Sequence, residues 1–404
     1  MTATPPADTA APSSDIGRVI LLLALAAFAS SCAFRICDPL LPQLAREFAT
    51  TTGDAAHAVT IFAVAYGVFQ FFFGPIGDRY GKYRAITAAT LLCAIGSVGV
   101  ALAPSMDVML FARFLSGAAG AGIVPLSMAW IGDNVDYADR QATLARFVSG
   151  TIIGMAAGQL IGGIFADTLG WRWAFVFLAI IYLAVGSLLV VMRPPQPVVT
   201  AGARTEFLRP MREVVAQPWA RVVLLTVFLE GALVFGVLAF VPATVQLRFG
   251  LGPTAAGAVG GVFALGGLLY VVIARRLVMA LGEAGLVAAG GVLLAVSFVL
   301  YAVGPIWMWS VIAGLVCGFA YYLFHSTLQT HATQMMPARR GTAVALFACC
   351  LFLGQSAGVA GAAALIDGAG ANWMYGIAAV ATPLVAAYFT RALRARKKDA
   401  APAV

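Results

Sequence analysis

The sequence predicts an all-α membrane protein whose twelve transmembrane helices form two pseudo-symmetric six-helix bundles. Of its 404 residues, 61% are hydrophobic and 10% are charged, whereas an ordinary soluble domain has about 45–50% apolar and about 25% charged residues. A helix needs about 20 apolar residues to cross a bilayer, so the chain has room for roughly twelve crossings joined by short loops. Its cations gather in alternate loops, which is typical of a polytopic membrane protein.

The apolar runs divide into two sets of six predicted helices. The first set is expected at about 18–41, 57–77, 84–103, 108–131, 141–166 and 172–192. The second set is expected at about 219–242, 253–275, 284–303, 306–330, 341–366 and 372–391. We therefore expect a disordered cytoplasmic leader at 1–17 and an N-terminal bundle at 18–192. A cytoplasmic linker rich in proline and arginine follows at 193–218, then a C-terminal bundle at 219–391 and a basic cytoplasmic tail at 392–404.

The positions of lysine and arginine predict how the chain is oriented. If the amino terminus lies inside, 20 of the 25 Lys and Arg residues fall in cytoplasmic segments and three fall outside, namely Arg46, Arg172 and Arg248. Such a bias places both termini in the cytoplasm and implies an even number of crossings. We expect the protein to be integral to a bacterial cytoplasmic (inner) membrane.

The two halves repeat short patterns at an offset near 200 residues. Arg140 precedes the fifth predicted helix, and Arg340 precedes the eleventh. Gly158-Gln159 followed by Gly162 corresponds to Gly354-Gln355 followed by Gly358. Such an echo is expected when a chain contains two related helix bundles.

A short cationic turn, Gly74-Pro-Ile-Gly-Asp-Arg-Tyr-Gly-Lys-Tyr-Arg84, separates the second and third apolar runs. Its glycines allow two helices to approach closely and turn within a few residues, and Asp78 can complement the positive end of a neighbouring helix. The string resembles the loop signature of the major facilitator superfamily. We expect it to belong to a cytoplasmic gate made of Gly74, Gly77, Asp78, Arg79, Gly81, Lys82, Arg84, Asp133 and Arg140.

Two further segments resemble motifs of the same superfamily. The segment from Ala112 to Gly122 is similar to the fourth-helix motif, in which an arginine is followed by closely spaced glycines. The segment from Gly154 to Gly163 is similar to the glycine-rich fifth-helix motif of the twelve-helix drug/proton antiporters. Where that group has Gly-Pro, this chain has Gly158-Gln159, which removes a proline kink and adds an amide. The expected helix-packing glycines are Gly154, Gly158, Gly162 and Gly163.

Four ionisable residues lie within the predicted helices, namely Arg35, Asp38, Arg113 and Glu230. A charge in the hydrocarbon costs at least about 2.5–3.5 kcal/mol, so each is a candidate functional residue. The resemblance to drug/proton antiporters implies that Asp38 and Arg113 act in proton coupling and substrate binding. Glu230 is expected to bind a second proton or a cationic substrate. The alternatives are an ion pair between Arg35 and Asp38 that is purely structural, an Arg113 that only packs, and a Glu230 without a direct role.

Several uncharged or weakly basic side chains within the helices are expected to contact substrate together with Arg35, Asp38, Arg113 and Glu230. They are Tyr66, Gln70, Gln159, Tyr321, Tyr322, His325 and Gln355. Asp167 and Asp367 each follow an apolar run at the predicted outer face. We expect these two carboxylates to cap helices or seal an outer gate.

The resemblance and the intramembrane charges predict a proton-coupled secondary transporter that exports a small organic compound or drug by alternating access. Uptake or exchange of a small organic anion is an alternative, because the two intramembrane arginines could bind an anionic substrate. The net charge of the cavity discriminates between the two, and two acids against two arginines leave it balanced. A non-transporting assembly factor or receptor on the same fold is a third interpretation. No phosphate-binding loop, catalytic triad or metal cluster is evident in the sequence. We therefore expect no enzymatic activity, cofactor, metal or nucleic-acid partner, and a monomer that interacts with substrate, protons and the lipid bilayer.

Overall fold

The computed structural model describes residues 13–192, 194 and 208–399. Residues 1–12 of the expected leader, most of the expected linker and residues 400–404 of the expected tail lie outside the described residues. In the N-terminal half the helices are α1 (Ser13–Arg35), η1 (Asp38–Leu40), α2 (Leu41–Glu47), α3 (Thr52–Ala55), α4 (His57–Tyr80), α5 (Lys82–Ala101), α6 (Met106–Gly120), α7 (Ile123–Asn134), α8 (Tyr137–Asp167) and α9 (Trp171–Met192).

The C-terminal half repeats this arrangement of long helices joined by short turns. Its helices are α10 (Leu208–Ala216), α11 (Pro218–Glu230), η2 (Gly231–Phe235), α12 (Gly236–Leu238), α13 (Val241–Phe249), α14 (Pro253–Val303), α15 (Met308–Gln334), η3 (Pro337–Arg339), α16 (Arg340–Gly368) and α17 (Ala371–Asp399). The short helix α10 lies within the segment expected to be a linker. Helix α17 continues past residue 391 to Asp399, so it includes the first part of the expected basic tail.

The described residues form 11 segments that are long and apolar enough to cross a membrane. The longest, α14, has 51 residues, far more than the roughly 20 that one crossing needs. Gly282 interrupts it with a φ of 63° and a ψ of 175°, a conformation that glycine adopts without a side-chain clash. This break separates the two crossings that the sequence predicted at 253–275 and 284–303. The twelve-helix prediction is therefore confirmed, with the loop between the eighth and ninth crossings reduced to a kink.

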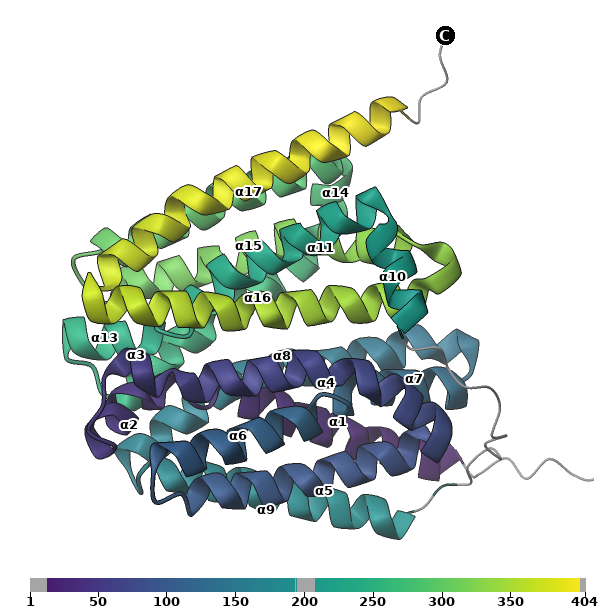
Figure 1. Ribbon diagram of the computed structural model, residues 1–404, viewed down its shortest axis with the longest axis horizontal. Helices are drawn as coiled ribbons and strands as arrows, with labels where there is room; N and C mark the ends of the chain where they lie inside the picture. The colour runs from purple at the N-terminus through teal and green to yellow at the C-terminus, as the bar shows by residue number, and fades with distance from the viewer. Residues whose placement is uncertain (1–12, 193, 195–207, 400–404) are drawn as a thin grey trace, which may run out of the picture.

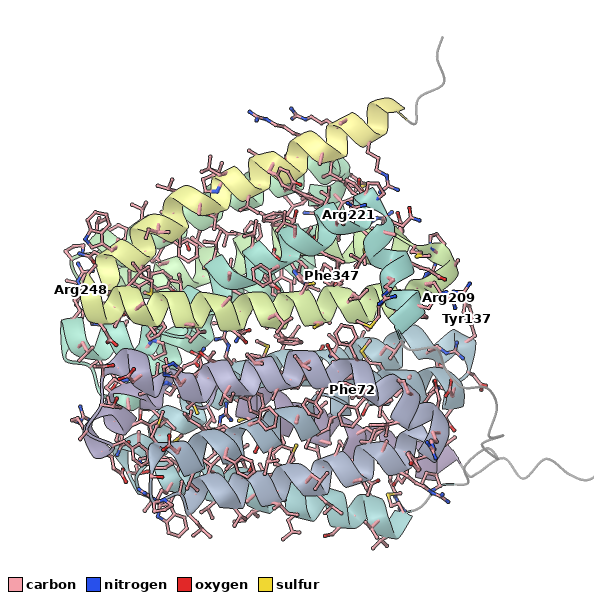
Figure 2. All side chains as sticks on the ribbon, in the orientation of Figure 1. Phe72, Tyr137, Arg209, Arg221, Arg248 and Phe347 are labelled. Carbon is pink, nitrogen blue, oxygen red and sulfur yellow. The ribbon has the colours of Figure 1, made fainter. Side chains whose placement is uncertain are left out.

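The long helices run side by side between two ends of the bundle (Figure 1). We call the end where α1 begins and α17 finishes the terminal face, which lies to the right in Figure 1. The other end, which includes the turns at 48–51 and 250–252, is the distal face. Tyr137, Arg209 and Arg221 lie at the terminal face and Arg248 at the distal face (Figure 2).

The first crossing of each half is irregular near its candidate charged residue. Helix α1 ends at Arg35, and the crossing continues through η1 and α2 to Glu47, beyond the predicted end at residue 41. In the C-terminal half, Glu230 is followed directly by the π-helical turn η2. Irregular backbone inside a membrane protein occurs where it is buried in protein or lines a cavity, and π-helical turns are frequent at functional sites. Both breaks thus place a carboxylate at a local distortion in the bundle.

The halves pack together along two helix pairs, α4 with α16 and α8 with α14. Glycines allow these contacts to be close, since a Cβ on Gly163 would meet the backbone of Pro253, and one on Gly257 would meet the carbonyl of Gln159. Small residues at such crossings are the usual way to bring helix backbones together in a membrane.

Candidate functional site

Asp38 accepts two hydrogen bonds inside the N-terminal half. Its Oδ2 atom lies 3.0 Å from Nη1 of Arg35 and 3.2 Å from Nε2 of Gln159. Asp38 is 0% exposed and Arg35 is 2% exposed. The other carboxylate oxygen, Oδ1, has no hydrogen-bond partner among the described residues. Gln159 Oε1 likewise has no hydrogen-bond partner among the described residues. The structure therefore brings together three predicted site residues, in a cluster with two unused acceptors.

Arg35 also reaches across the interface between the halves. Its guanidinium carbon lies 5.0 Å from the ring centroid of Phe235, on the π-helical turn η2. With Gln159 and Tyr322, Arg35 lines a cavity of about 20 Å³. This is room for about one water molecule. In the structure, the space beside Arg35 is thus too small for an organic substrate.

Arg113, the other residue to which the resemblance assigns a role, is bonded to backbone carbonyls rather than to Asp38. Its Nε donates to the carbonyl of Ala58 at 3.0 Å, and its Nη1 donates to the carbonyl of Ala33 at 2.9 Å. The guanidinium carbon lies 4.0 Å from the ring centroid of Phe62. Ala33 is in the last turn of α1, where carbonyls lack helical partners, so the arginine is drawn to backbone acceptors. In this conformation Arg113 joins α1, α4 and α6.

Glu230 and His325 form a second buried pair, in the C-terminal half. Glu230 Oε2 lies 2.7 Å from His325 Nδ1, and Glu230 Oε1 has no hydrogen-bond partner among the described residues. The imidazole stacks on Tyr321, with the ring centroids 4.7 Å apart and the planes at 19°. Its other aromatic neighbour is Phe347, at 5.5 Å. Both Glu230 and His325 were candidates from sequence, but nothing in the sequence indicated that they pair.

Aromatic rings connect the two polar clusters. The ring centroids of Phe235 and Tyr321 are 5.0 Å apart, and Phe235 lies beneath the guanidinium of Arg35. A continuous series of contacts therefore runs from Arg35 through Phe235 and Tyr321 to His325 and Glu230. Sequence reasoning missed Phe235, since one phenylalanine in an apolar helix carries no distinguishing pattern.

The comparisons with known proteins agree with this architecture. The family model described as Major Facilitator Superfamily matches residues 23–338 and 245–403. The chain belongs to the Major Facilitator Superfamily. Among curated relatives, it is 32% identical to an uncharacterized MFS-type transporter, YwfA, of Bacillus subtilis over 38% of this chain and 39% of that protein. It is 27% identical to the inner membrane transport protein YnfM of Escherichia coli over 41% of this chain and 40% of that protein.

A further relative of this facilitator is the efflux pump radE of Floropilus chiversii, 26% identical over 47% of this chain and 36% of that protein. The matched stretches thus span about two fifths of the length of these curated relatives. Among solved structures, the nucleoside transporter NupG has a TM-score of 0.77 at 13% identity, covering 92% of this chain and 99% of that chain. A D-xylose-proton symporter has a TM-score of 0.74 at 16% identity, covering 92% of this chain and 97% of that chain. At such identities these structures establish the fold alone.

The remaining predicted substrate contacts of the facilitator are more dispersed. Tyr66 is buried beside Phe352, with ring centroids 4.8 Å apart across the interface between the halves. Gln70 is half-buried and Gln355 is buried, and each has a side-chain atom without a hydrogen-bond partner among the described residues. Tyr322 stacks on Tyr270 as well as lining the small cavity. Across the described residues, no group of three or more His, Cys, Asp or Glu side chains is placed to hold a metal ion.

Residues of the predicted cytoplasmic gate lie at the terminal face. Lys82 pairs with Asp133, which ties the start of α5 to the end of α7. Arg79 lies over the ring of Tyr80, and Arg140 donates to the carbonyl of Val135. The hydrogen bonds and ion pairs described for these gate residues remain within the N-terminal half.

The glycines of the fifth-helix motif face two neighbouring helices. A Cβ on Gly154, Gly158 or Gly162 would meet the backbone of α1, and one on Gly163 would meet the start of α14. The motif is therefore a packing seam that lets α8 lie against both α1 and α14. That seam positions Gln159 to reach Asp38.

Two carboxylates at the distal face bind helix starts of the opposite half. Asp167 Oδ2 accepts from the backbone N–H of Thr254 at 2.7 Å. Asp367 accepts from the Thr51 hydroxyl at 2.6 Å and from the Gly53 N–H at 3.1 Å. Helix N-termini carry partial positive charge, which favours a carboxylate there. The two acids expected near an outer gate thus join the halves, through partners that the sequence did not indicate.

Proposed function

We propose that this facilitator is a proton-coupled secondary transporter that exports a small organic compound by alternating access. The observation that carries the proposal is the buried Glu230–His325 pair. The rings of Tyr321 and Phe235 connect it to the Arg35–Asp38 pair of the other half. Intramembrane ionisable groups that are buried and paired mark ion and substrate pathways. The proposal places the terminal face in the cytoplasm, because most of the cations lie there.

Charge balance supports a coupling role for Glu230. An ionised Glu230 beside a neutral imidazole leaves one net negative charge buried in the C-terminal half. Burying an uncompensated charge is unfavourable, so the pair attracts a proton or a cationic substrate. If the two compete for this pair, binding of one promotes release of the other. An inward proton gradient then drives outward movement of the substrate.

Asp38 is the second proposed coupling site. When ionised, it is neutralised by Arg35 and accepts a further hydrogen bond from Gln159. Protonation of Asp38 would weaken its attraction for the guanidinium, which would free Arg35 to interact with substrate or with the facing half. Because Arg35 already lies over Phe235, a change at Asp38 bears directly on the contact between the halves.

The hydrogen bonds between the halves support an alternating-access cycle. Among the described residues, those bonds lie toward the distal face, including the bonds of Asp167 and Asp367 and the bond from Gln246 to the carbonyl of Pro39. We assign the structure to a state closed on the distal side. Opening that side requires these bonds to break. The segment from Gly74 to Arg84, where α4 ends and α5 begins on either side of Gly81, would then close the terminal face.

Uptake or exchange of a small organic anion is the second candidate function. It is favoured by Arg35, which lines the small cavity at the interface. Arg113 gives this alternative little support, because backbone carbonyls occupy its guanidinium.

Purified protein in proteoliposomes containing an internal pH dye tests the proposal. We expect wild-type protein to move protons when one member of a panel of lipophilic cations, neutral antibiotics and organic acids is added. Asp38→Asn should abolish this movement while the protein remains folded. Proton-driven flux of the wild-type size in Asp38→Asn would contradict the role of Asp38. Coupled flux of organic acids only would favour the anion alternative.

A further inference from the structure

A groove between α17 and the part of α14 that follows the Gly282 break lies away from the proposed transport site. Its walls are small or apolar, with Ala288 and Val292 on α14 and with Pro383 and Ala387 on α17. The groove encloses about 280 Å³, many times the roughly 30 Å³ that a water molecule occupies in the liquid. Helix α17 lies at the edge of the bundle (Figure 1), and Val292 and Ala387 in the groove wall are exposed, so the groove is open to the surroundings of the bundle.

The end of the groove nearest the terminal face is basic. Arg391 and Arg394 lie one helical turn apart, are exposed, and line the same groove. Among the described residues that line it, none is acidic. The two guanidinium groups therefore have no neutralising carboxylate within the lining, and they make that end of the groove positive.

An unpaired hydroxyl lies beside these arginines. Thr390 also lines the groove and is 6% exposed, yet its Oγ1 atom has no hydrogen-bond partner among the described residues. A threonine in a helix commonly satisfies its hydroxyl with the carbonyl four residues earlier, as Thr382 does with Ala378. Thr390 leaves this bond unmade, so a buried hydroxyl beside the two arginines has no acceptor among the described residues.

An apolar trough that ends in two arginines and a hydroxyl fits a ligand with a hydrocarbon chain and an anionic head. Arginine binds phosphate through parallel N–H donors, and basic pockets between helix ends are typical sites for anionic lipids. We propose that this groove binds one anionic phospholipid from the leaflet at the terminal face. Its acyl chain lies along Ala288 and Ala387, and its phosphate lies between Arg391 and Arg394, with Thr390 as a further donor.

Native mass spectrometry of the detergent-purified protein tests this site without a transport substrate. Wild-type protein, incubated with equal amounts of dioleoylphosphatidylglycerol and dioleoylphosphatidylcholine, should retain one phosphatidylglycerol in preference. The double variant Arg391→Gln/Arg394→Gln should lower that retention about 30-fold, since each cation near an anionic headgroup contributes a factor of about five. The control Arg275→Gln/Arg276→Gln removes the same charge from exposed arginines outside the groove, and should retain the lipid as wild type does.

Two further variants keep the test decisive if the double variant does not fold. Ala387→Phe fills the trough without changing charge, and Thr390→Val removes the hydroxyl while keeping the side-chain shape. Both should reduce phosphatidylglycerol retention, with the larger loss in Ala387→Phe. Equal retention of the two lipids by wild type would overturn the proposal, as would equal losses in the two double-arginine variants. Displacement of the lipid by inorganic phosphate alone would indicate an anion site that does not use the acyl chain.

Discussion

Asp167 and Asp367, 200 residues apart in the chain, make equivalent contacts across the two halves. Asp167 ends α8 and binds the start of α14, whereas Asp367 lies near the end of α16 and binds the start of α3. Each carboxylate thus joins the end of one crossing to the beginning of a crossing in the other half. The pseudo-symmetry predicted from sequence is therefore present in the contacts that close the distal face.

We expect Asp367→Ala to favour opening of the distal face. The change removes two hydrogen bonds and a carboxylate at a helix start. The equilibrium between the closed and open states of the distal face should therefore shift about tenfold toward the open state. Electron-paramagnetic-resonance distances between spin labels at Leu102 and Leu247, exposed positions on the two halves, would report the shift. Asp367→Asn retains an acceptor and should shift it less. A distance distribution in Asp367→Ala identical to that of the parent would contradict this role.

Glu230→Gln should abolish substrate-dependent proton movement. The substitution keeps the size of the side chain and can still hydrogen-bond His325, but it removes the group that exchanges a proton. In the proteoliposome assay we expect at least a tenfold loss, corresponding to about 1.4 kcal/mol or more in coupling. Glu283→Gln is the matched control, because Glu283 is an exposed carboxylate near the Gly282 break. Equal losses in both variants would indicate a general charge effect.

Arg113→Lys separates a structural role from a substrate role. Lysine keeps the positive charge but lacks the guanidinium fork that reaches Ala58 and Ala33 together. If Arg113 serves to join the helices, Arg113→Lys should lower the free energy of unfolding by about 2–4 kcal/mol, the range for losing hydrogen bonds from a buried charged donor. Denaturant unfolding of the purified protein measures this change. Wild-type stability with impaired substrate binding would instead support direct contact with substrate.

Two glycines on α8 should respond oppositely to the same substitution. In Gly158→Ala the new methyl group would meet the backbone of Cys32 too closely for both to remain in place, and overpacking of this kind costs about 1–3 kcal/mol. In Gly150→Ala the atom nearest to the new methyl group is the carbonyl oxygen of Ala24, at 3.8 Å, so the methyl group fits. The higher helix propensity of alanine should then stabilise the protein by up to about 1 kcal/mol. Thermal unfolding of the two variants side by side checks this prediction. Equal melting temperatures would contradict the close packing of α8 on α1.

The ion pair between Glu213 on α10 and Arg339 on η3 should weaken in acid. Hydrogen bonding and charge from Arg339, with a smaller contribution from Arg209, lower the pKa of Glu213 from its ordinary 4.5. A lowered folded-state pKa means that the stabilisation is complete above pH 4.5 and is lost as the pH falls through the folded-state value. The melting temperature of the wild type should therefore fall more between neutral pH and pH 4 than the melting temperature of Glu213→Gln. Parallel pH profiles would show that this exposed cluster contributes nothing measurable.

Much of the architecture could be predicted from local features of the sequence. Twelve apolar runs, the bias of cations toward alternate loops and the turn from Gly74 to Arg84 were sufficient for the fold and family, because span length, charge and turn chemistry act over short stretches of chain. The same reasoning found Asp38, Glu230 and His325 as candidates, since an ionisable residue in an apolar run is conspicuous. It predicted that the first crossing ends at residue 41. In the structure the crossing continues past Pro39 and Pro42 to Glu47, because the chain remains helical through η1 and α2.

Which groups bind one another was decided only by the tertiary structure. Glu230 and His325 are 95 residues apart, and Arg113 could have met Asp38 as easily as the carbonyls of Ala33 and Ala58. Helix packing sets these choices, because the rotation and depth of each helix determine which side chains come within hydrogen-bond distance. Those rotations depend on glycine contacts such as Gly158 against Cys32, which involve the whole bundle. The sequence by itself therefore determined the membrane-spanning fold, its family and its candidate charges, whereas the packing of distant helices decided how those charges are paired.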